Sequence, residues 1–494
     1  MLEICKKLFS QLNESKVCYC HWKSNEHLKE GLDGVTDLDV LLENEDKKRC
    51  YIILDNLDFI FCKSQYGSRY PNVVDWVGFD EKSGRMIHLH LHFRMVTGHK
   101  GVKEYSLPWY KNVLDTRLLD NETGVYISDA NYELVTLYSR IGLKAHAKHI
   151  LKAKKGEFVL DDNYAREISY LKERVSYDVV KSILEKYYED SWQDMLNIIE
   201  LPILDSGSFL KLKSITEQVM AKFSRFSKPT VKIWEAYFFF IGQIRSKLRN
   251  KIGYNLILKK TPYLNCGLTI AFLGQDGAGK STVTEAIEKW VRWKLDAKRF
   301  YLGSGDHFNP WEKKVQKVLN CDFVLLTLLR ACLSCSIYVK LSRSVLKSIC
   351  KAEHYADKGG IALYDRYPQT LFPGINDGPK IRSKLLPKAS NPLLKLILNA
   401  LANIEESHLR KAEKHSPNIV IKLMLSPEES VRRKPENDIQ VIQAKHEVIK
   451  SLHFEGAKVY EVDAEHDYSE ELRNIKSIIW SNLIEKVKCQ KKQK

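Results

Sequence analysis

Three glycines, a lysine and two hydroxyl residues are concentrated in the sequence AFLGQDGAGKST, residues 271–282. The apolar residues 268–273 before the glycines predict a buried strand, and Val283, Ile287 and Val291 recur after them at helical spacing. Glycines between a strand and a helix allow backbone amides to turn toward an anion, which the positive end of the helix also attracts. The segment therefore predicts a phosphate-binding loop.

The residue types in this loop indicate that the phosphates belong to ATP and that Mg²⁺ accompanies them. Lys280 is long enough to reach the β- and γ-phosphates, and the hydroxyl of Ser281 can coordinate Mg²⁺. We therefore expect ATP and Mg²⁺ as the cofactors. The predicted binding residues are Gly274, Asp276, Gly277, Ala278, Gly279, Lys280, Ser281 and Thr282.

A second motif, GIALYDRYP at residues 360–368, places charged side chains directly after another apolar strand. Asp365 can hold Mg²⁺ or orient the attacking oxygen, and Arg366 can stabilise charge on a phosphoryl group in transit. The alternative is an ordinary ion pair at the end of a surface strand. The nearby phosphate loop favours the catalytic interpretation.

Five short apolar stretches in the C-terminal half are separated by helical patterns. This alternation predicts a parallel, doubly wound α/β sheet over residues 262–485, with ligands bound beyond the carboxyl ends of its strands. The loop and Asp365 both lie at such ends. The predicted strands are residues 268–273, 299–302, 360–368, 419–425 and 458–464.

With FLGQDGAGKST and LYDRYP, residues 262–485 resemble the thymidylate kinases, P-loop enzymes that transfer the γ-phosphate of ATP to dTMP. The resemblance implies that Asp276 contacts the acceptor sugar. It also implies that SPEESVRRKPEND, residues 426–438, is a lid whose Arg432 and Arg433 clamp the ATP phosphates. The last strand, 458–464, would lie near the adenine. A nucleoside monophosphate is then the expected substrate, with dTMP as the first candidate.

The acceptor stays open, because LGSGDHFNP, residues 302–310, stands where thymidylate kinases carry an Arg-Glu-Pro-type segment. One alternative keeps the kinase but changes the acceptor to a sugar or a lipid-linked glycan. An alternative of another class is an ATP-gated regulatory protein that binds nucleotide or nucleic acid.

The N-terminal residues suggest a second site, because Asp37 and Asp39 alternate along a predicted strand and so face one side. Two carboxylates on one face can share divalent metals. Together with Lys23 and Ser24 in a preceding turn, they resemble the minimal nucleotidyltransferase superfamily over residues 15–110.

In that superfamily a third acidic residue completes the metal site, but this sequence has His90 at the matching position. Asp75, on the preceding strand, is a candidate substitute. His88, His90 and His92 share one face and could bind a metal, or could belong to a half-buried sheet face. We therefore expect weak or absent nucleotidyl transfer with Mg²⁺ and a structural or binding role for this domain.

The 494 residues accommodate several domains. We expect a nucleotidyltransferase-like α+β domain at 1–115, a helical region at 116–255 without chemistry of its own, the kinase-like domain at 262–485, and a disordered basic tail at 486–494. The net charge of +16 suits polyanions, from nucleotides to nucleic acid. The oligomeric state is left open.

The chain has features of a cytoplasmic protein. Its N-terminus predicts an amphipathic helix without the pattern of a signal peptide, and eleven cysteines without paired spacing indicate reduced thiols. The most apolar stretch, residues 321–339, is interrupted by Arg330, so we expect no transmembrane segment there. We expect a buried helix instead, with peripheral membrane contact as the alternative.

Overall fold

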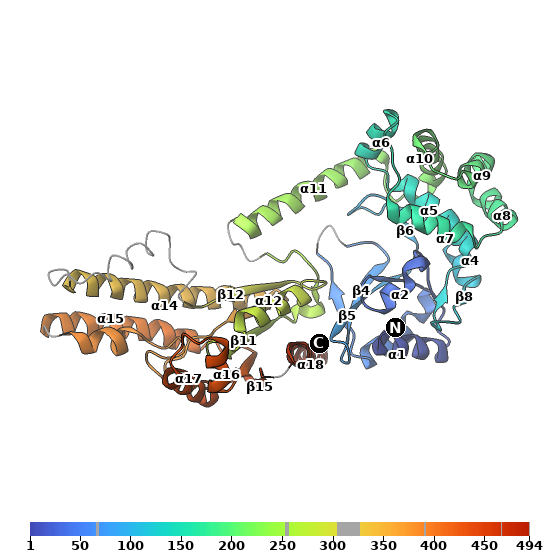
Figure 1. The fold of residues 1–494 in the computed structure, drawn as a ribbon. Coiled ribbons are helices and arrows are strands. Elements are labelled where there is room, and N and C mark those ends of the chain that lie inside the picture. The colour runs from blue at the N-terminus through green and yellow to red at the C-terminus, as the bar shows by residue number, and fades with distance from the viewer. Residues whose placement is uncertain (66–68, 252–255, 304–326, 390–391, 466, 494) are drawn as a thin grey trace. The chain divides into compact units, whose positions relative to one another are not determined.

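The computed structural model describes residues 1–65, 69–251, 256–303, 327–389, 392–465 and 467–493 (Figure 1). The chain forms two compact units, Met1–Tyr254 and Asn255–Lys494, which we call unit 1 and unit 2. Two predicted segments lie partly outside the described part of the chain. They are residues 304–310 of LGSGDHFNP and residues 321–326 of the apolar stretch 321–339.

Unit 2 is built on a sheet with the strand order β12-β13-β11-β14-β15, in which every neighbouring pair is parallel. The prediction of a parallel α/β sheet is therefore confirmed. The strands are β11 (Leu268–Gly274), β12 (Ala297–Tyr301), β13 (Ile361–Asp365), β14 (Ile419–Met424) and β15 (Lys458–Asp463).

Helices cover both faces of this sheet, which explains why β11 and β13 are almost continuously apolar. Side chains of α14 and α17 share one core cluster with alternate residues of β11, and α12 packs against β11, β12 and β13 with a separate set of buried residues. The helices are α12 (Lys280–Val291), α14 (Thr327–Asp357), α15 (Pro392–Glu413), α16 (Pro427–Arg433), α17 (Ile439–Ser451) and α18 (Tyr468–Lys492).

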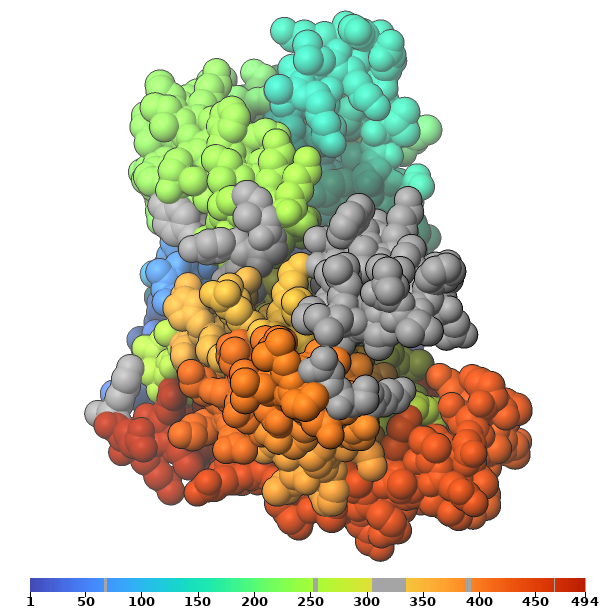
Figure 2. Space-filling model, turned by 90° about the vertical axis from the view of Figure 1, so that its left-hand side faces the viewer, coloured from blue at the N-terminus to red at the C-terminus, as the bar shows by residue number. Residues whose placement is uncertain are grey.

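The long helices α14 and α15 pack against each other, and Figure 2 shows them in yellow and orange as neighbouring parts of one surface. Cys335, on α14, is fully buried in a cluster with Leu394 and Leu398 of α15. Within the described residues, no helix combines the length and the apolar character that a membrane crossing requires.

The prediction of a disordered tail at 486–494 is wrong, because α18 continues to Lys492. Ile475, Ile479, Leu483 and Val487 are buried at helical spacing, so the apolar stripe extends into the basic segment. Lys486 Nζ also donates to the carbonyl oxygen of Gly267 at 2.6 Å. The prediction considered only the basic residues after 486, whereas the helical spacing of apolar residues begins earlier, at Ile475.

Unit 1 contains a mixed sheet in which the strands of this unit follow the order β3-β4-β5-β2-β1-β9-β8, together with a small pair, β6 and β7. β2 and β5 are parallel, whereas β4 and β5 are antiparallel. The strands are β1 (Tyr19–His21), β2 (Leu38–Leu42), β3 (Ile60–Lys63), β4 (Val73–Asp80), β5 (Arg85–His92), β6 (Val96–Thr97), β7 (Tyr105–Ser106), β8 (Leu118–Leu119) and β9 (Tyr126–Ile127).

One face of the unit 1 sheet packs on the predicted N-terminal helix α1 and on α3, and these helices share a core with Val40 of β2 and Leu89 of β5. Because side chains alternate along a strand, Asp39 and His90 point to the opposite face. The helices of the sheet region are α1 (Glu3–Glu14), α2 (Leu28–Leu32), α3 (Lys47–Asn56) and α4 (Tyr110–Asp115).

A helical bundle adjoins this sheet within unit 1, and its core cluster includes Trp22 and Leu41 of the sheet region. Residues 132–150, whose apolar residues recur at helical spacing, are divided between α5 and α6 in the structure, and α5 is buried almost all round. The bundle helices are α5 (Ala130–Leu143), α6 (Ala147–Lys154), α7 (Asp162–Lys172), α8 (Tyr177–Tyr188), α9 (Trp192–Glu200), α10 (Ser206–Met220) and α11 (Lys228–Lys251).

Candidate functional site

The glycine-rich loop connects β11 to α12 in unit 2, as predicted. Gly277 and Gly279 have φ angles of 92° and 77°, in the left-handed region that side chains with a Cβ rarely adopt. Lys280, the first residue of α12, folds back over the loop and donates to the carbonyl oxygens of Gly274 at 2.7 Å and Gln275 at 2.8 Å. The loop and its lysine thus have the backbone geometry that phosphate binding requires.

Burial, reinforced by the positive charge of Arg366, lowers the pKa of Lys280 to about 8. An anion bound beside this ammonium group would oppose both effects and favour its charged form. Ala278, within the loop, is buried, whereas Thr282 is exposed on α12. The environment of Lys280 therefore favours the binding of a negatively charged ligand beside its ammonium group.

Ser281 and Asp365 meet because β11 and β13 are adjacent parallel strands, with Phe272 opposite Asp365. The Ser281 hydroxyl donates to Asp365 Oδ2 at 2.9 Å. The carboxylate is 2% exposed, and its Oδ1 atom has no hydrogen-bond partner among the described residues. A hydroxyl and a buried carboxylate oxygen are hard oxygen donors, so this pair fits Mg²⁺.

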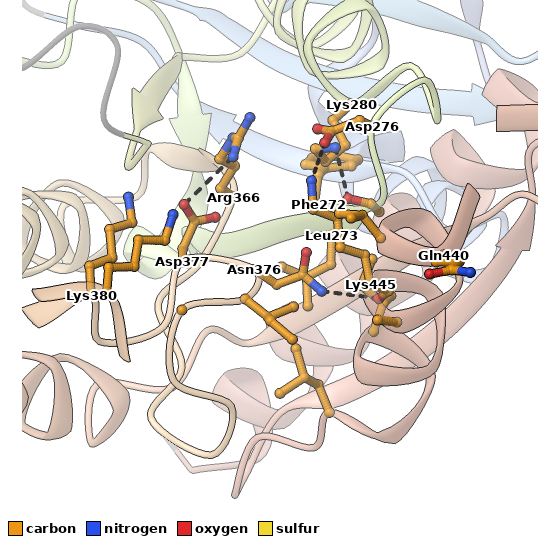
Figure 3. Close-up of a pocket in the computed structure, with 18 residues that line it drawn as sticks. Phe272, Leu273, Asp276, Lys280, Arg366, Asn376, Asp377, Lys380, Gln440 and Lys445 are labelled. Carbon is orange, nitrogen blue, oxygen red and sulfur yellow. Dashed lines mark hydrogen bonds and ion pairs between the residues drawn. The ribbon is translucent and has the colours of Figure 1, made fainter. Parts of the chain in front are cut away.

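Asp276 points toward α17 and pairs with Lys445 (Figure 3). Burial opposes ionisation of Asp276, but the hydrogen bond and charge of Lys445 outweigh it and lower the pKa of this carboxyl group. The neighbouring Gln275 anchors the loop, because its Nε2 donates to the carbonyl oxygen of Leu425 at 2.7 Å and its Oε1 lies 3.0 Å from His446 Nδ1. The sequence carried no signal for Gln275, Lys445 or His446.

A cavity of about 640 Å³ opens beside the loop, a size typical of small-molecule sites. Figure 3 shows Lys280 and Asp276 on one side of it and Lys380 on the other, with Arg366 between them. Arg366 has a left-handed backbone, φ 75°, and its Nη1 lies 3.6 Å from Asp377 Oδ1. The cavity is therefore rich in cations.

The segment 376–384 forms the side of the cavity that lies opposite Lys280. No function was predicted for this segment from the sequence. Asn376 and Asp377 have positive φ angles of 43° and 64°, which are uncommon outside glycine and concentrate at functional sites. Lys380 and Lys384 line the cavity beside them. The run NDGPK was a detectable turn signal, but its place against the loop depends on tertiary structure.

The two predicted lid arginines do not line this cavity. Arg432 is 77% exposed and pairs with Glu429 at 2.5 Å, and Arg433 Nε lies 2.8 Å from the same carboxylate. These hydrogen bonds lower the pKa of Glu429 to about 2. Helix α16, which carries these arginines, does contact the glycine-rich loop, because the Ser430 hydroxyl donates to the carbonyl oxygen of Asp276.

In unit 1, Asp37 and Asp39 face the three histidines of β5, so the prediction that both carboxylates point to one side is confirmed. His88 lies between two carboxylates: its Nδ1 is 2.9 Å from Asp37 Oδ1, and its Nε2 is 3.2 Å from Asp75 Oδ1. His90 lies between Asp39 at 3.3 Å and Asp75 at 3.1 Å. Asp75 therefore joins this group, but two imidazole rings separate it from the other carboxylates.

Asp39 has further partners in this group. His92 Nε2 lies 3.0 Å from its carboxylate, and Lys23 Nζ lies 2.9 Å from it. Burial opposes ionisation of Asp39, but Lys23 and the hydrogen bonds from His90 and His92 outweigh it and hold its pKa well below the usual range. Burial also disfavours protonation of His90, yet hydrogen bonds with Asp39 and Asp75 raise its pKa to about 9.

Cations from the helical bundle and from the connection between β6 and β7 adjoin this network. Arg140 of α5 is 6% exposed, and its Nη1 has no hydrogen-bond partner among the described residues; Glu167 Oε1 lies 3.7 Å away. Burial and the charges of Lys23 and Arg140 lower the pKa of Lys103 to about 8. Burial, Arg140 and Lys103 likewise hold the pKa of Lys144 well below its usual range.

No family model matches the chain. The chain is similar to the ATP-binding protein YghR of Escherichia coli K12, with 26% identity over 223 residues, which cover 42% of this chain and 86% of YghR. It is also similar to the ATP-binding protein YghS of the same organism, with 26% identity over 226 residues, 41% of this chain and 89% of YghS.

Among solved structures, deoxyadenosine kinase from M. mycoides with bound dATP shares 17% sequence identity with the chain. The similarity covers 43% of this chain and 98% of the kinase, with a TM-score of 0.27. A second structure of that kinase, with bound dCTP, gives 16% identity over 43% of this chain and 100% of the kinase, with a TM-score of 0.25. These scores are too low for the likeness to support an argument about this chain.

Proposed function

We propose that unit 2 is an ATP-dependent phosphotransferase that moves the γ-phosphate of ATP to a small phosphorylated acceptor. The observation that carries this proposal is the position of Lys280 and the Ser281–Asp365 pair beside a cation-lined cavity. ATP as the phosphate donor is further supported by the similarity to two proteins named as ATP-binding.

In this mechanism the loop amides and Lys280 hold the β- and γ-phosphates. Mg²⁺, when bound at Ser281 and Asp365, would neutralise phosphate charge. Arg366 stabilises negative charge on the transferring group from the acceptor side of the cavity. An acceptor oxygen attacks the γ-phosphorus, the bond to the bridging oxygen of ADP breaks, and ADP leaves with that electron pair.

The acceptor side favours a substrate that already carries a phosphate. Lys380, Lys384 and Arg366 line the cavity, while Asp377 provides one opposing carboxylate beside them. Arg366 is partly balanced by Asp377 at 3.6 Å, but a neutral nucleoside or sugar would leave the excess positive charge of this side of the cavity unbalanced. A nucleoside monophosphate supplies that anion, and we propose dTMP as the first candidate. Asp276 would then contact its sugar after releasing Lys445.

A phosphorylated sugar or a phosphate-bearing lipid-linked glycan satisfies the same charge requirement and is the first rival. The decisive experiment is a screen for ATP consumption across nucleoside monophosphates and phosphosugars, with the Lys280→Ala variant as a blank. We expect ADP formation with dTMP to exceed this blank. Product formation only with phosphosugars would replace the acceptor. Nucleotide binding without turnover on any compound would favour an ATP-gated regulatory protein.

We infer a second role for unit 1, the binding of a phosphorylated ligand. This role is supported by the buried Arg140 Nη1, which lies 3.7 Å from Glu167 Oε1 but has no hydrogen-bond partner among the described residues, and by the nearby Lys103 and Lys144. Calorimetric titration with ATP in a Lys280→Ala background tests it. Arg140→Met should remove an ATP-binding event that survives in Arg166→Met, an exposed control on α7. Identical isotherms for the two variants would contradict this role.

A further inference from the structure

A second group of potential metal ligands in unit 1 lies outside both sites described above. His99 comes from the connection between β6 and β7, His146 precedes α6, and Glu235 lies on α11. One ligand atom from each lies within 4.8 Å of the others. His146 Nδ1 is 3.3 Å from Glu235 Oε1, and the ring centroids of His99 and His146 are 5.8 Å apart.

The His99 ring is already oriented by a buried carboxylate. Its Nδ1 lies 2.7 Å from Glu104 Oε1, and its backbone amide donates to Glu104 Oε2 at 3.0 Å. Glu104 is 1% exposed, and a Cβ at Gly98 would collide with its carboxylate. A histidine whose Nδ1 is held by a carboxylate presents Nε2 to a metal, and such carboxylate–histidine pairs are common behind zinc ligands.

The separation of the His146 and Glu235 ligand atoms also fits a tetrahedral metal ion. Zinc ligands at about 2.1 Å from the ion lie about 3.4 Å from one another, close to the separation of the His146 and Glu235 atoms. The side chains of His146 and Glu235 are 38% and 40% exposed, so an ion can reach them and water can complete its coordination. Two imidazoles and one carboxylate are ligands that zinc prefers.

We propose that His99, His146 and Glu235 form a zinc site that clamps helix α11 to the body of unit 1. Such a connection would stabilise the position of α11, because Val231 is the one buried residue along the part of this helix that the structure describes. Farther along α11, Arg245 Nη2 donates a hydrogen bond to Gln65 Oε1 of unit 1 at 2.9 Å. Zinc would join three segments that are far apart in the sequence.

The test uses the full chain, stripped with a chelator and titrated with Zn²⁺ alone. Glu235→Gln and His146→Gln should each lose one equivalent of bound zinc, whereas His27→Gln should retain it. His27 is a matched control because its Nε2 lies 2.8 Å from Glu26 but belongs to no group of three potential ligands in the described chain. Glu104→Gln should retain the site with about 10–100-fold weaker affinity. Circular dichroism verifies the fold of each variant.

A second measurement follows the proposed clamp itself. Zinc should slow tryptic cleavage of α11 after Lys232 several-fold in the wild type and in His27→Gln, but not in Glu235→Gln. Equal zinc stoichiometry and affinity in folded Glu235→Gln and wild type would overturn the site. Zinc binding without this difference in protection would overturn the clamp.

Discussion

The two charged centres of this chain differ in how their charges are balanced. Beside the loop of unit 2, Asp365 Oδ1 has no hydrogen-bond partner among the described residues, and several cations line an open cavity. In unit 1, Asp39 is matched by Lys23, His90 and His92. Buried charge without internal compensation indicates a place for a ligand, whereas compensated charge is already stable without one. This contrast supports the proposal that the first centre receives substrates, whereas the carboxylates of the second are held by imidazoles.

The largest expected effect comes from removing the loop lysine. Lys280→Ala should reduce phosphoryl transfer by about 10²–10³-fold, because a positioned charge in a water-poor site is lost. Lys23→Ala, which removes the lysine of the other centre, should leave the rate unchanged. ADP formation with the acceptor found in the screen measures both. A folded Lys280→Ala protein with undiminished turnover would remove the kinase assignment.

The second prediction concerns the stability of unit 1 and its dependence on pH. Hydrogen bonds with Asp39 and Asp75 outweigh burial and raise the pKa of His90 from 6.5 to about 9. The imidazolium therefore stabilises the folded state fully below pH 6.5, and this contribution is lost as the pH rises through 9. The shift in the pKa of His90 corresponds to at most about 3–4 kcal/mol.

Urea unfolding of the wild type and of His90→Gln at pH 6 and pH 9.5 measures this contribution. The difference between their free energies of unfolding should shrink at the higher pH. A His90→Gln difference that does not change with pH would mean that His90 is not charged in the folded state.

The third prediction compares two aspartates. Asp276→Ala should weaken the apparent affinity for the acceptor by about 10–100-fold, the value expected for a hydrogen bond to a charged group. ATP binding should survive, and Asp39→Ala should leave both parameters unchanged. Steady-state kinetics with varied acceptor separates these effects. If Asp276→Ala changes ATP affinity instead, the aspartate serves the loop through Lys445 and not the acceptor.

The sequence predicted the parts of the candidate site in unit 2 that depend on local pattern. The strand before Gly274, the helix after Lys280 and the strand ending at Asp365 each have a clear period, and the parallel sheet follows from their alternation. Lys380 and Lys445 could not be predicted in this way. They reach the cavity through tertiary packing of irregular or helical segments, for which no periodicity specifies a partner.

The same limit explains the outcome in unit 1. The alternation of Asp37 and Asp39 predicted a shared face, and β5 supplies three histidines to that face. Arg140 and Lys144, by contrast, belong to a helical pattern typical of a packed spacer. Their approach to Lys23 depends on how α5 docks on the sheet, which the sequence pattern does not specify.

The smallest expected effect is in nucleotidyl transfer by unit 1. A metal site of the superfamily type needs oxygen ligands grouped around the ion, but here His88 and His90 stand between Asp75 and the other two carboxylates. Imidazole nitrogens suit Mn²⁺ or Zn²⁺ better than Mg²⁺. With labelled nucleoside triphosphates, Mg²⁺ and candidate acceptors, the full chain should therefore transfer no more label than Asp39→Asn. Robust transfer that disappears in folded Asp37→Asn and Asp39→Asn variants would show instead that the carboxylates release their imidazoles and bind metal when the nucleotide arrives.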